Sequence, residues 1–212
     1  MAPRKKVIIT GGAGLIGSIL ISRLKNKYEL SSLDLVEVEE IKSFTGSISN
    51  PDDLRNAFQG QDMVIHLAAD KNAEATWESV LERNFVGTYN VFEAAKDTSV
   101  NRVIVASSNH TTGGFYTVEP WKYIVEGNFD LLPPEGYSLI DENSDIRPDG
   151  YYGVSKAYGE ALGSYYRDYH ELGSLHLRIG WVISDDDPSF SPFASSLWLS
   201  HFDTANIFER CI

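Results

Sequence analysis

Two side chains in the segment YYGVSK have the types and the spacing of a proton-transfer pair. Tyr152 and Lys156 are four residues apart, and on a helix this spacing places both on one face. An unperturbed tyrosine, with a pKa of about 10, is a poor base. A neighbouring ammonium favours the phenolate and lowers that pKa, so the pair could transfer a proton near neutral pH. Taken alone, the spacing is better explained by a surface aromatic beside a solvated lysine.

A run of polar residues, ASSNHTTGG, follows the apolar stretch RVIV. Turn-forming residues in a loop would explain it. So would polar groups that converge on a ligand, because ligands bind at the carboxyl ends of parallel strands. On the second interpretation the hydroxyl of Ser107 or Ser108 holds a substrate oxygen against Tyr152, and Asn109 and His110 bind further hydroxyl groups. For His110, a loop histidine with satisfied hydrogen bonds is the alternative.

A glycine-rich turn, TGGAGLIG, places Gly11, Gly14 and Gly17 between a predicted strand and a predicted helix. In a dinucleotide-binding turn the first glycine permits the tight turn, the second lets a pyrophosphate approach the backbone, and the third lets helix and strand pack closely. The helix N-terminus then offers free N–H groups to the phosphates. The strand-turn-helix context favours this interpretation over a glycine turn without a ligand. With such a turn in the chain, Tyr152 and Lys156 are better explained as a proton-transfer pair.

An acidic residue ends the second predicted strand. Asp34 lies 17 residues after Gly17, close to where a dinucleotide-binding fold needs an acid. A carboxylate there accepts hydrogen bonds from both ribose hydroxyls and repels a 2′-phosphate, and no Arg or Lys follows closely to offset that repulsion. The sequence therefore favours NAD over NADP. The alternative is that Asp34 is a cap or turn residue.

Strand-like and helix-like segments alternate along the chain. This order predicts right-handed crossovers and an α/β fold, with a doubly wound parallel sheet and helices on both faces. Apolar runs and apolar periodicity predict strands over 7–10, 30–37, 63–69, 102–107 and 174–180, and helices over 15–27, 51–60 (with Asn50 as N-cap), 77–97, 151–171 and 203–211.

One domain is expected for a chain of 212 residues. The segment 115–150 breaks the alternation, because it is rich in Pro, Gly, Asp and Glu and is too long for an ordinary connection. We expect an inserted loop there, with one short helix. The last predicted helix, with Asp203 as its N-cap, has no strand after it, whereas a doubly wound sheet usually continues. This suggests that the C-terminal substrate region is incomplete.

The composition excludes several kinds of partner. A net charge of −12, from 18 basic and 30 acidic residues, argues against binding nucleic acid or an anionic membrane surface. No apolar run approaches the ~20 residues that span a bilayer, and the N-terminal segment lacks the apolar region of a signal peptide. The single cysteine, Cys211, excludes an internal disulfide framework and fits a reducing cytoplasm. We expect no metal site.

Together these motifs resemble the extended short-chain dehydrogenase/reductases of the NAD-dependent epimerase/dehydratase family. The resemblance implies a Rossmann fold, bound NAD and a catalytic set in which Ser108 orients the substrate, Tyr152 is the acid and base, and Lys156 binds the nicotinamide ribose. The residues that carry it are TGGAGLIG, Asp34, HLAA (66–69), Asn84, Ser107 with Ser108, and Tyr152 with Lys156. The residues that it implies for NAD binding are Gly11, Gly14, Leu15, Ile16, Gly17, Asp34, Ser47, Ile48, Leu67, Ala68, Ala69, Asn84, Ser107, Tyr152 and Lys156.

A narrower resemblance, to the uronate dehydrogenases and the archaeal NAD-dependent glucose-6-phosphate dehydrogenases, is carried by SSNHTTGGFY, RPDGYYGVSKAYGE, LRIG and LWLSHFD. Those enzymes oxidise a cyclic sugar at C1 to a lactone. The guanidinium of Arg178 could grip a carboxylate or phosphate with two bonds, and an ion pair at a strand end is the alternative. The residues that this resemblance implies for substrate binding are Ser108, Asn109, His110, Tyr152 and Arg178.

The chain also departs from that pattern. The 115–150 insertion looks closer to the sugar-phosphate branch, and Lys71 stands where uronate dehydrogenases have a small polar residue. Lys71 could meet a phosphate, or be a solvated loop lysine. Our hypothesis is an NAD-dependent sugar dehydrogenase for a sugar phosphate or a uronate. The alternatives are a nucleotide-sugar 4-epimerase or dehydratase, which RIGWVISDDDPS disfavours, and a non-catalytic dinucleotide-sensing module, which the intact catalytic set disfavours. The resemblance also implies packing into a homodimer.

Overall fold

Six parallel strands form one sheet in the computed structural model, which describes residues 3–212. The strand order is β3-β2-β1-β4-β5-β6, and all five neighbouring pairs run parallel. The order reverses between β1 and β4, and the carboxyl ends of strands beside such a point are where this type of sheet binds ligands. The strands are β1 (Lys6–Thr10), β2 (Glu29–Asp34), β3 (Lys42–Thr45), β4 (Met63–His66), β5 (Arg102–Ser108) and β6 (Gly173–Ile179).

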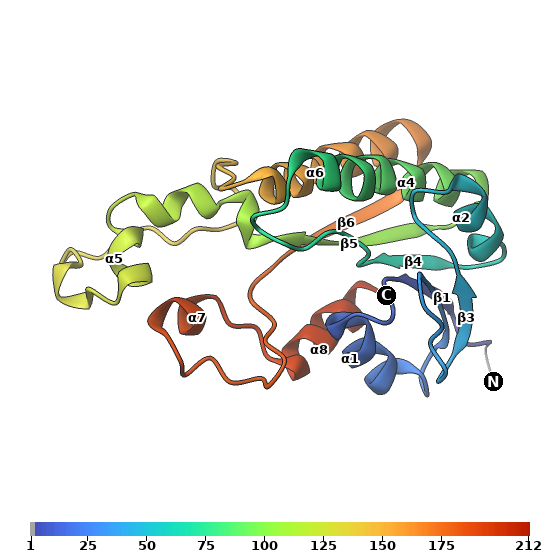
Figure 1. Ribbon diagram of the computed structural model, residues 1–212, viewed down its shortest axis with the longest axis horizontal. Coiled ribbons are helices and arrows are strands. Elements are labelled where there is room, and N and C mark those ends of the chain that lie inside the picture. The colour runs from blue at the N-terminus through green and yellow to red at the C-terminus, as the bar shows by residue number, and fades with distance from the viewer. Residues whose placement is uncertain (1–2) are drawn as a thin grey trace.

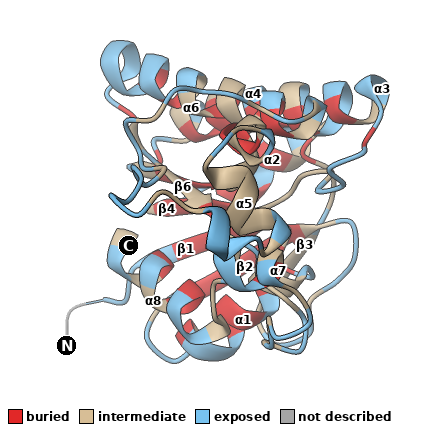
Figure 2. Cartoon of the chain, turned by 90° about the vertical axis from the view of Figure 1, so that its left-hand side faces the viewer, coloured by how far each residue is buried: buried red, intermediate tan, exposed pale blue. Residues whose placement is uncertain are grey.

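Helices cover both faces of the sheet, which confirms the predicted doubly wound architecture. Figure 1 shows α1 and α8 on one face and α2, α4 and α6 on the other. Successive strand residues point into opposite cores: Val64 and Val103 pack with α2, α4 and α6, while Ile65 and Ile104 pack with α1 and α8. Buried residues therefore concentrate in the strands and on the inner sides of the helices (Figure 2). The α-helices are α1 (Leu15–Leu24), α2 (Pro51–Phe58), α3 (Trp77–Val80), α4 (Gly87–Asp97), α5 (Trp121–Glu126), α6 (Tyr151–His170), α7 (Pro192–Leu197) and α8 (His201–Cys211).

Side-chain caps explain where two helices begin. Asn50 is the N-cap of α2 as predicted, because its Oδ1 accepts a hydrogen bond from the Asp52 N–H at 3.1 Å. The predicted start of the last helix is wrong. Its N-cap is Ser200, whose Oγ accepts from the Asp203 N–H at 3.0 Å. Asp203 therefore lies in the first turn, where its charge complements the helix dipole.

Three elements differ in kind from the sequence-based expectation: β3, a π-helical turn, and α7 at Pro192–Leu197, where no helix was expected. β3 was not expected, because its sequence KSFT has neither a continuous nor an alternating apolar pattern; it is a partly exposed edge strand paired with β2. The helix predicted over 77–97 contains a π-helical turn, Leu81–Val86, between α3 and α4. This turn carries Asn84, and π-helical turns are frequent at functional sites.

The segment 115–150 contains one short α-helix, α5, as expected, together with short 3₁₀ turns. Figure 1 shows the segment reaching beyond the carboxyl ends of β5 and β6, where α5 packs against α7. Two backbone hydrogen bonds close its base: the Gly114 N–H donates to the Arg147 carbonyl at 2.6 Å, and the Arg147 N–H donates to the Thr111 carbonyl at 2.9 Å. The last residues of the segment are thereby held against the loop that follows β5.

His66 is a buried titratable group at the carboxyl end of β4. Its Nδ1 lies 2.8 Å from Thr10 Oγ1 and its Nε2 lies 3.2 Å from Thr88 Oγ1. Burial, followed by the charges of Lys156 and His176, lowers the pKa of His66 from 6.5 to about 3. Between these two pH values the unfolded chain binds a proton at this ring that the folded protein does not bind.

We therefore expect the free energy of unfolding to fall as the pH is lowered from 6.5 towards 3, and this ring to contribute about 1 kcal/mol per pH unit. Urea unfolding across that range should show a weaker pH dependence for His66→Gln than for the wild type. His170→Gln, at the exposed end of α6, is the matched control and should keep the wild-type dependence. Equal slopes for His66→Gln and the wild type would contradict the prediction.

Candidate active site

The N-terminal half of α6 crosses the end of β5 and brings the predicted proton-transfer pair to it. The ammonium of Lys156 donates to the carbonyl oxygen of Ala106 in β5 at 2.8 Å. Its Nζ lies 5.4 Å from the ring centroid of Tyr152, one helical turn earlier. The approach needs a glycine, because a Cβ at Gly153 would lie 2.3 Å from the carbonyl oxygen of His110. The helix and the loop after β5 are therefore in direct backbone contact.

The protonation of this pair differs from the expectation. Burial raises the pKa of Tyr152, and a hydrogen bond with Ser108 lowers it again in part. Burial also lowers the pKa of Lys156 to about 8. The net shift of the Tyr152 pKa is opposite to the one predicted from the neighbouring ammonium, because desolvation of the phenol dominates.

Hydrogen bonds connect the side chains of Ser108, Asn109 and Tyr116 at the end of β5. Ser108 is the N-cap of a short 3₁₀ turn; its Oγ accepts from the His110 N–H at 3.2 Å and donates to Asn109 Oδ1 at 3.4 Å. The amide nitrogen of Asn109 donates to the hydroxyl of Tyr116, the second residue of the inserted segment. Tyr116 has no place among the sequence-based expectations, because a single aromatic in a loop carries no pattern.

An acidic residue from the other end of the insertion holds His110. Nδ1 of His110 lies 2.9 and 2.8 Å from Oδ1 and Oδ2 of Asp149. The imidazole also meets the ring of Tyr152 edge to face, with the centroids 5.5 Å apart. Asp149 was not predicted, although its position in RPDG, directly before the helix that carries Tyr152, is the signal that could have identified it.

Arg178 forms an ion pair, which is the alternative given for it above. Its Nε and Nη2 donate to the two carboxylate oxygens of Glu160 at 3.0 and 2.8 Å. Burial alone would raise the pKa of Glu160, but the hydrogen bonds from Arg178 and Ser107 lower it overall. Within residues 3–212 the buried Nη1 of Arg178 has no hydrogen-bond partner.

Ser107, predicted to contact the cofactor, directs its hydroxyl to this ion pair instead. Its Oγ donates to Glu160 Oε1 at 2.6 Å. Ser107 is level with Arg178 in the register of β5 and β6. Both serines meet α6: Ser107 bonds to Glu160, whereas Ser108 is the serine that lowers the Tyr152 pKa.

A cavity of about 830 Å³ adjoins this cluster, between α6, β6, α7 and residues 115–142 of the inserted segment. Asn109, Glu160 and Arg178 contribute polar atoms to its wall, whereas Ser108 and Tyr152 lie outside its lining. The cavity therefore extends the site on the side of the predicted substrate residues. Its aromatic wall consists of Phe115, Tyr116, Trp121 and Tyr137.

The glycine turn between β1 and α1 has a geometry that requires glycine at two positions. Gly11 has a φ of +80°, and a Cβ there would lie 2.8 Å from the backbone nitrogen of Ala68. A Cβ at Gly17 would lie 2.5 Å from the carbonyl oxygen of Gly12. Gly14 is the exposed N-cap of α1, and no side chain caps this helix. The first N–H groups of α1 are therefore open to a phosphate.

Asp34 lies beside this turn at the end of β2. Its Oδ2 accepts from the Ala13 N–H at 2.9 Å and its Oδ1 from the Leu35 N–H at 2.7 Å. The carboxylate thus has the local turn contacts given above as the alternative, and these contacts hold it at the edge of the glycine turn. An open helix N-terminus beside a carboxylate at a strand end fits a dinucleotide. Its pyrophosphate would contact the helix N-terminus, and a ribose would contact the carboxylate.

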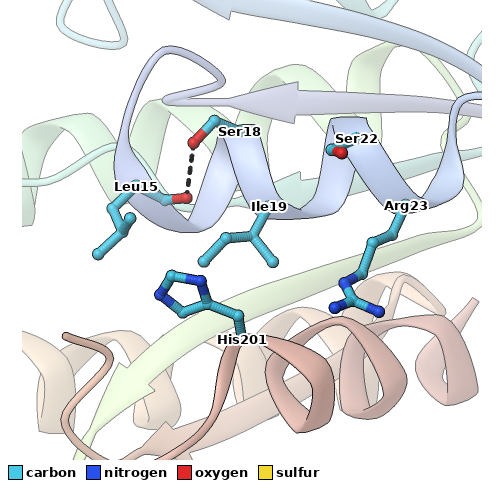
Figure 3. Close-up of a pocket in the computed structure, with 6 residues that line it drawn as sticks. All are labelled: Leu15, Ser18, Ile19, Ser22, Arg23 and His201. Atoms are coloured by element: carbon cyan, nitrogen blue, oxygen red, sulfur yellow. Dashed lines mark hydrogen bonds between the residues drawn. The ribbon is translucent and has the colours of Figure 1, made fainter. Parts of the chain in front are cut away.

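Leu15 and Ile16 begin α1, and Leu15 faces away from the sheet edge. Figure 3 shows its side chain directed towards His201 of α8, across a hollow of about 370 Å³. His201 Nε2 lies 2.7 Å from the carbonyl oxygen of Ile183, so its ring already has a backbone partner. The contribution of Leu15 to a phosphate site would come from its backbone N–H.

The remaining residues predicted along the cofactor follow β3 and β4. Ile48 is 9% exposed and belongs to the core on the α4 side, and the Ser47 hydroxyl accepts from a nearby backbone N–H at 3.1 Å. Asn84 holds the loop after β4: its amide accepts from the Asp70 N–H at 2.7 Å, donates to the Asp70 carbonyl at 2.9 Å and donates to Ser155 in α6 at 3.0 Å. That loop contains the partly buried Leu67, Ala68 and Ala69 and the exposed Lys71.

Comparisons with known proteins identify the family of the chain. A model of the "NAD dependent epimerase/dehydratase family" matches residues 7–202. The chain is 35% identical over 98% of its length to the L-arabinose 1-dehydrogenase (NAD(P)(+)) of Haloferax volcanii, of which it covers 82%, and 33% identical over 97% to the NAD-dependent glucose-6-phosphate dehydrogenase of that organism, of which it covers 79%. A mutant uronate dehydrogenase from Agrobacterium tumefaciens, complexed with NAD, matches with a TM-score of 0.75 at 26% identity over 97% of this chain and 71% of that one. The predicted family resemblance is confirmed.

The buried ammonium of Lys156 predicts an alkaline dependence of stability. Its pKa is about 8 in the folded protein and 10.5 ordinarily, so between these values the unfolded chain binds more protons. The wild type should therefore gain stability as the pH rises from 8 to 10.5, and Lys156→Met should lose that gain without a lower unfolding midpoint at pH 7. Thermal unfolding at both pH extremes measures it. Lys122→Met, in the exposed part of the insertion, is the control and should keep the wild-type pH dependence. The same dependence in Lys156→Met would contradict the prediction.

Three glycine-to-alanine variants, at Gly60 after α2 and at Gly11 and Gly14 in the glycine turn, separate strain, clash and ligand contact. Gly60 has a φ of +69° and open space around an added Cβ, so Gly60→Ala measures backbone strain alone, about 1 kcal/mol. Gly11→Ala adds a backbone clash and should lower the unfolding midpoint further. Gly14→Ala should keep the fold but weaken NAD binding at least about tenfold in calorimetric titration, because its Cβ would stand where a pyrophosphate approaches. Unchanged NAD affinity in Gly14→Ala would contradict this placement.

Proposed function

Because the chain belongs to the NAD dependent epimerase/dehydratase family, we propose that it is an NAD-dependent dehydrogenase that oxidises a cyclic aldose at C1 to the lactone. The observation that carries the proposal is the cluster of Ser108, Tyr152 and Lys156 at the end of β5, on the sheet edge that also carries the glycine turn. The three relatives described above are sugar dehydrogenases by name, which supports the same type of reaction here.

The residues that would hold NAD lie at three strand ends. The N-terminus of α1 would take the pyrophosphate, Asp34 the adenosine ribose and Lys156 the nicotinamide ribose. The nicotinamide supplies the hydride acceptor when it is bound. The first basic residue after Asp34 is Lys42, so no nearby cation offsets a 2′-phosphate, and NAD is preferred to NADP.

The chemistry of the chain itself is a proton transfer. The Ser108 hydroxyl lies close enough to Tyr152 to lower the phenol pKa in part, and the anomeric hydroxyl would be held between the two side chains. As C1 loses a hydride, the phenolate oxygen of Tyr152 takes the hydroxyl proton, and the C1–O bond becomes the lactone carbonyl. Burial opposes formation of the phenolate, so the charge of Lys156 is needed to support it. That support declines as the pH rises above the Lys156 pKa of about 8.

The rest of the sugar would meet Asn109, His110 and Arg178 on the side of the larger cavity. Arg178 uses two of its nitrogens on Glu160 and offers the third, so it would contribute a single bond to a carboxylate, a phosphate or a hydroxyl. Lys71 is exposed on the loop after β4 and would supply the second cation for an anionic sugar. A sugar phosphate or a uronate is the proposed substrate class, and the arabinose enzyme among the relatives adds a neutral aldose to the test.

Assembly and location belong to the same proposal. Outward apolar side chains on α4 and α6, among them Tyr89, Tyr165 and Tyr169, support a homodimer formed through these helices. Within residues 3–212, no helix combines the length and the apolar character that crossing a membrane requires. Cys211 is the single cysteine of the sequence, so the fold uses no internal disulfide, which supports a reducing compartment, the cytoplasm.

A substrate panel and one variant pair test the proposed reaction. Glucose 6-phosphate, glucuronate, galacturonate, L-arabinose and glucose are each incubated with NAD and with NADP, and reduced nucleotide is followed by absorbance. We expect turnover with NAD and at least one aldose, and a loss of about 10²-fold or more in kcat for Tyr152→Phe with unchanged NAD affinity. Tyr169→Phe, exposed near the other end of α6, is the matched control.

Two outcomes would count against the proposal. Equal activity of the wild type and Tyr152→Phe would remove the role given to the phenol. The absence of nucleotide reduction with every aldose, together with conversion of a nucleotide-linked sugar, would favour an epimerase or dehydratase instead.

A further inference from the structure

Asp149 is a charged residue of the site to which the reaction above gives no role. Its carboxylate meets Nδ1 of His110 at 2.9 and 2.8 Å through both oxygens. The two side chains are 28% and 27% exposed, so the pair is accessible to a ligand at the mouth of the site. The imidazole lies edge to face with Tyr152, with 5.5 Å between the ring centroids. His110 therefore contacts both the Asp149 carboxylate and the ring of Tyr152.

The backbone around Asp149 is arranged for this contact. A Cβ at Gly113 would lie 2.1 Å from Asp149 Oδ2, so a glycine leaves the space that the carboxylate fills. The backbone of Arg147 bonds to Gly114 at 2.6 Å and to Thr111 at 2.9 Å, which ties the chain before Asp149 to the loop after β5. The carboxylate is thus fixed relative to that loop by main-chain contacts as well as by the histidine.

A carboxylate at Nδ1 determines which ring nitrogen carries the proton. Because an ionised carboxylate only accepts hydrogen bonds, Nδ1 is the donor, and Nε2 of the neutral ring is left as an acceptor. We propose that Asp149 is a positioning residue, which holds His110 with Nδ1–H on the carboxylate and Nε2 facing the sugar as an acceptor for one ring hydroxyl. The inserted segment 115–150 thereby contributes to substrate recognition through its last residues.

The orientation of His110 has a consequence for specificity. An acceptor fixed at one point favours a sugar that has a hydroxyl there, and a deoxy sugar leaves the nitrogen unpaired. Without Asp149 the ring could adopt the other tautomer and present a donor at the same point. The inference rests on the proposed sugar site, so its first test does not use activity.

The tautomer of His110 can be measured directly in the wild-type protein. Long-range ¹H–¹⁵N correlation spectra of ¹⁵N-histidine-labelled protein, with His110→Gln to assign the signals, report which nitrogen of the neutral ring is protonated. We expect protonated Nδ1 and unprotonated Nε2 in the wild type, and a mixture of tautomers in Asp149→Asn, whose amide can accept or donate. A wild-type ring protonated at Nε2 overturns the inference, whether or not the protein oxidises a sugar and whether or not the variant folds.

Steady-state kinetics give the second test, with the aldose that the panel identifies. Asp149→Asn should raise the KM for the sugar about tenfold and change kcat by less than about threefold, with NAD affinity unchanged. The double variant Asp149→Asn/His110→Gln should have the same KM for the sugar as His110→Gln alone, because both changes remove the same contact. Asp145→Asn, another exposed acid of the inserted segment, is the control for loss of charge and should leave both constants unchanged.

The two tests distinguish this inference from the proposed reaction. Additive effects of the two changes, or an unchanged KM in Asp149→Asn, would overturn the positioning role while leaving the sugar dehydrogenase in place. A protein with the expected tautomer that oxidises no aldose would refute the proposed reaction and leave the Asp149–His110 geometry established.

Discussion

The contact between α6 and the end of β5 is the constraint on which the site depends. Lys156 is bonded to a carbonyl of the sheet, and Gly153 allows the backbone of α6 to meet the backbone of the next loop. Further along the same helix, Tyr166 is fully buried and stacks on Phe92 of α4 with 5.1 Å between the ring centroids. With a core aromatic at one end and a sheet hydrogen bond at the other, α6 is fixed against rotation and sliding. The position of Tyr152 is therefore set by core packing rather than by a flexible loop.

Parallel topology explains why residues far apart in the chain share one edge of the sheet. β1 ends at the glycine turn, β2 at Asp34, β4 at the loop that Asn84 holds, and β5 at Ser108. The interiors of the central strands β1, β4 and β5 are apolar and buried, so their polar side chains collect where these strands stop. A ligand that spans this edge would meet the open N–H groups of α1 and then the phenol of Tyr152. The direction in which a dinucleotide could lie thus follows from strand order alone.

The parts that sequence predicted are those encoded by local spacing. The glycine turn and the pair Tyr152 and Lys156 each lie within a few residues of one another, and their geometry follows from one turn or one helix. Asp149, Tyr116 and Glu160 were missed because each acquires its role through a tertiary contact with a residue from another element. The sign of the Tyr152 pKa shift was missed for a related reason. Spacing reveals a neighbouring charge, whereas the desolvation that outweighs it depends on the packing of the whole site.

The ion pair of Arg178 and Glu160 limits how this arginine can act on a substrate. A guanidinium grips an anion with two bonds only if two of its nitrogens are free, and here Nε and Nη2 are held by the carboxylate. Displacing Glu160 would leave a partly buried carboxylate without its partner and beside an incoming anion. Both the unpaired charge and the repulsion between like charges cost free energy. The unpaired Nη1 instead gains a partner from any oxygen that reaches it, and satisfying a buried donor is worth about 1–3 kcal/mol. A hydroxyl, a carboxylate and a phosphate all provide such an oxygen. In the proposed sugar site, Arg178 would therefore select where an oxygen lies on the sugar more strongly than whether that oxygen is charged.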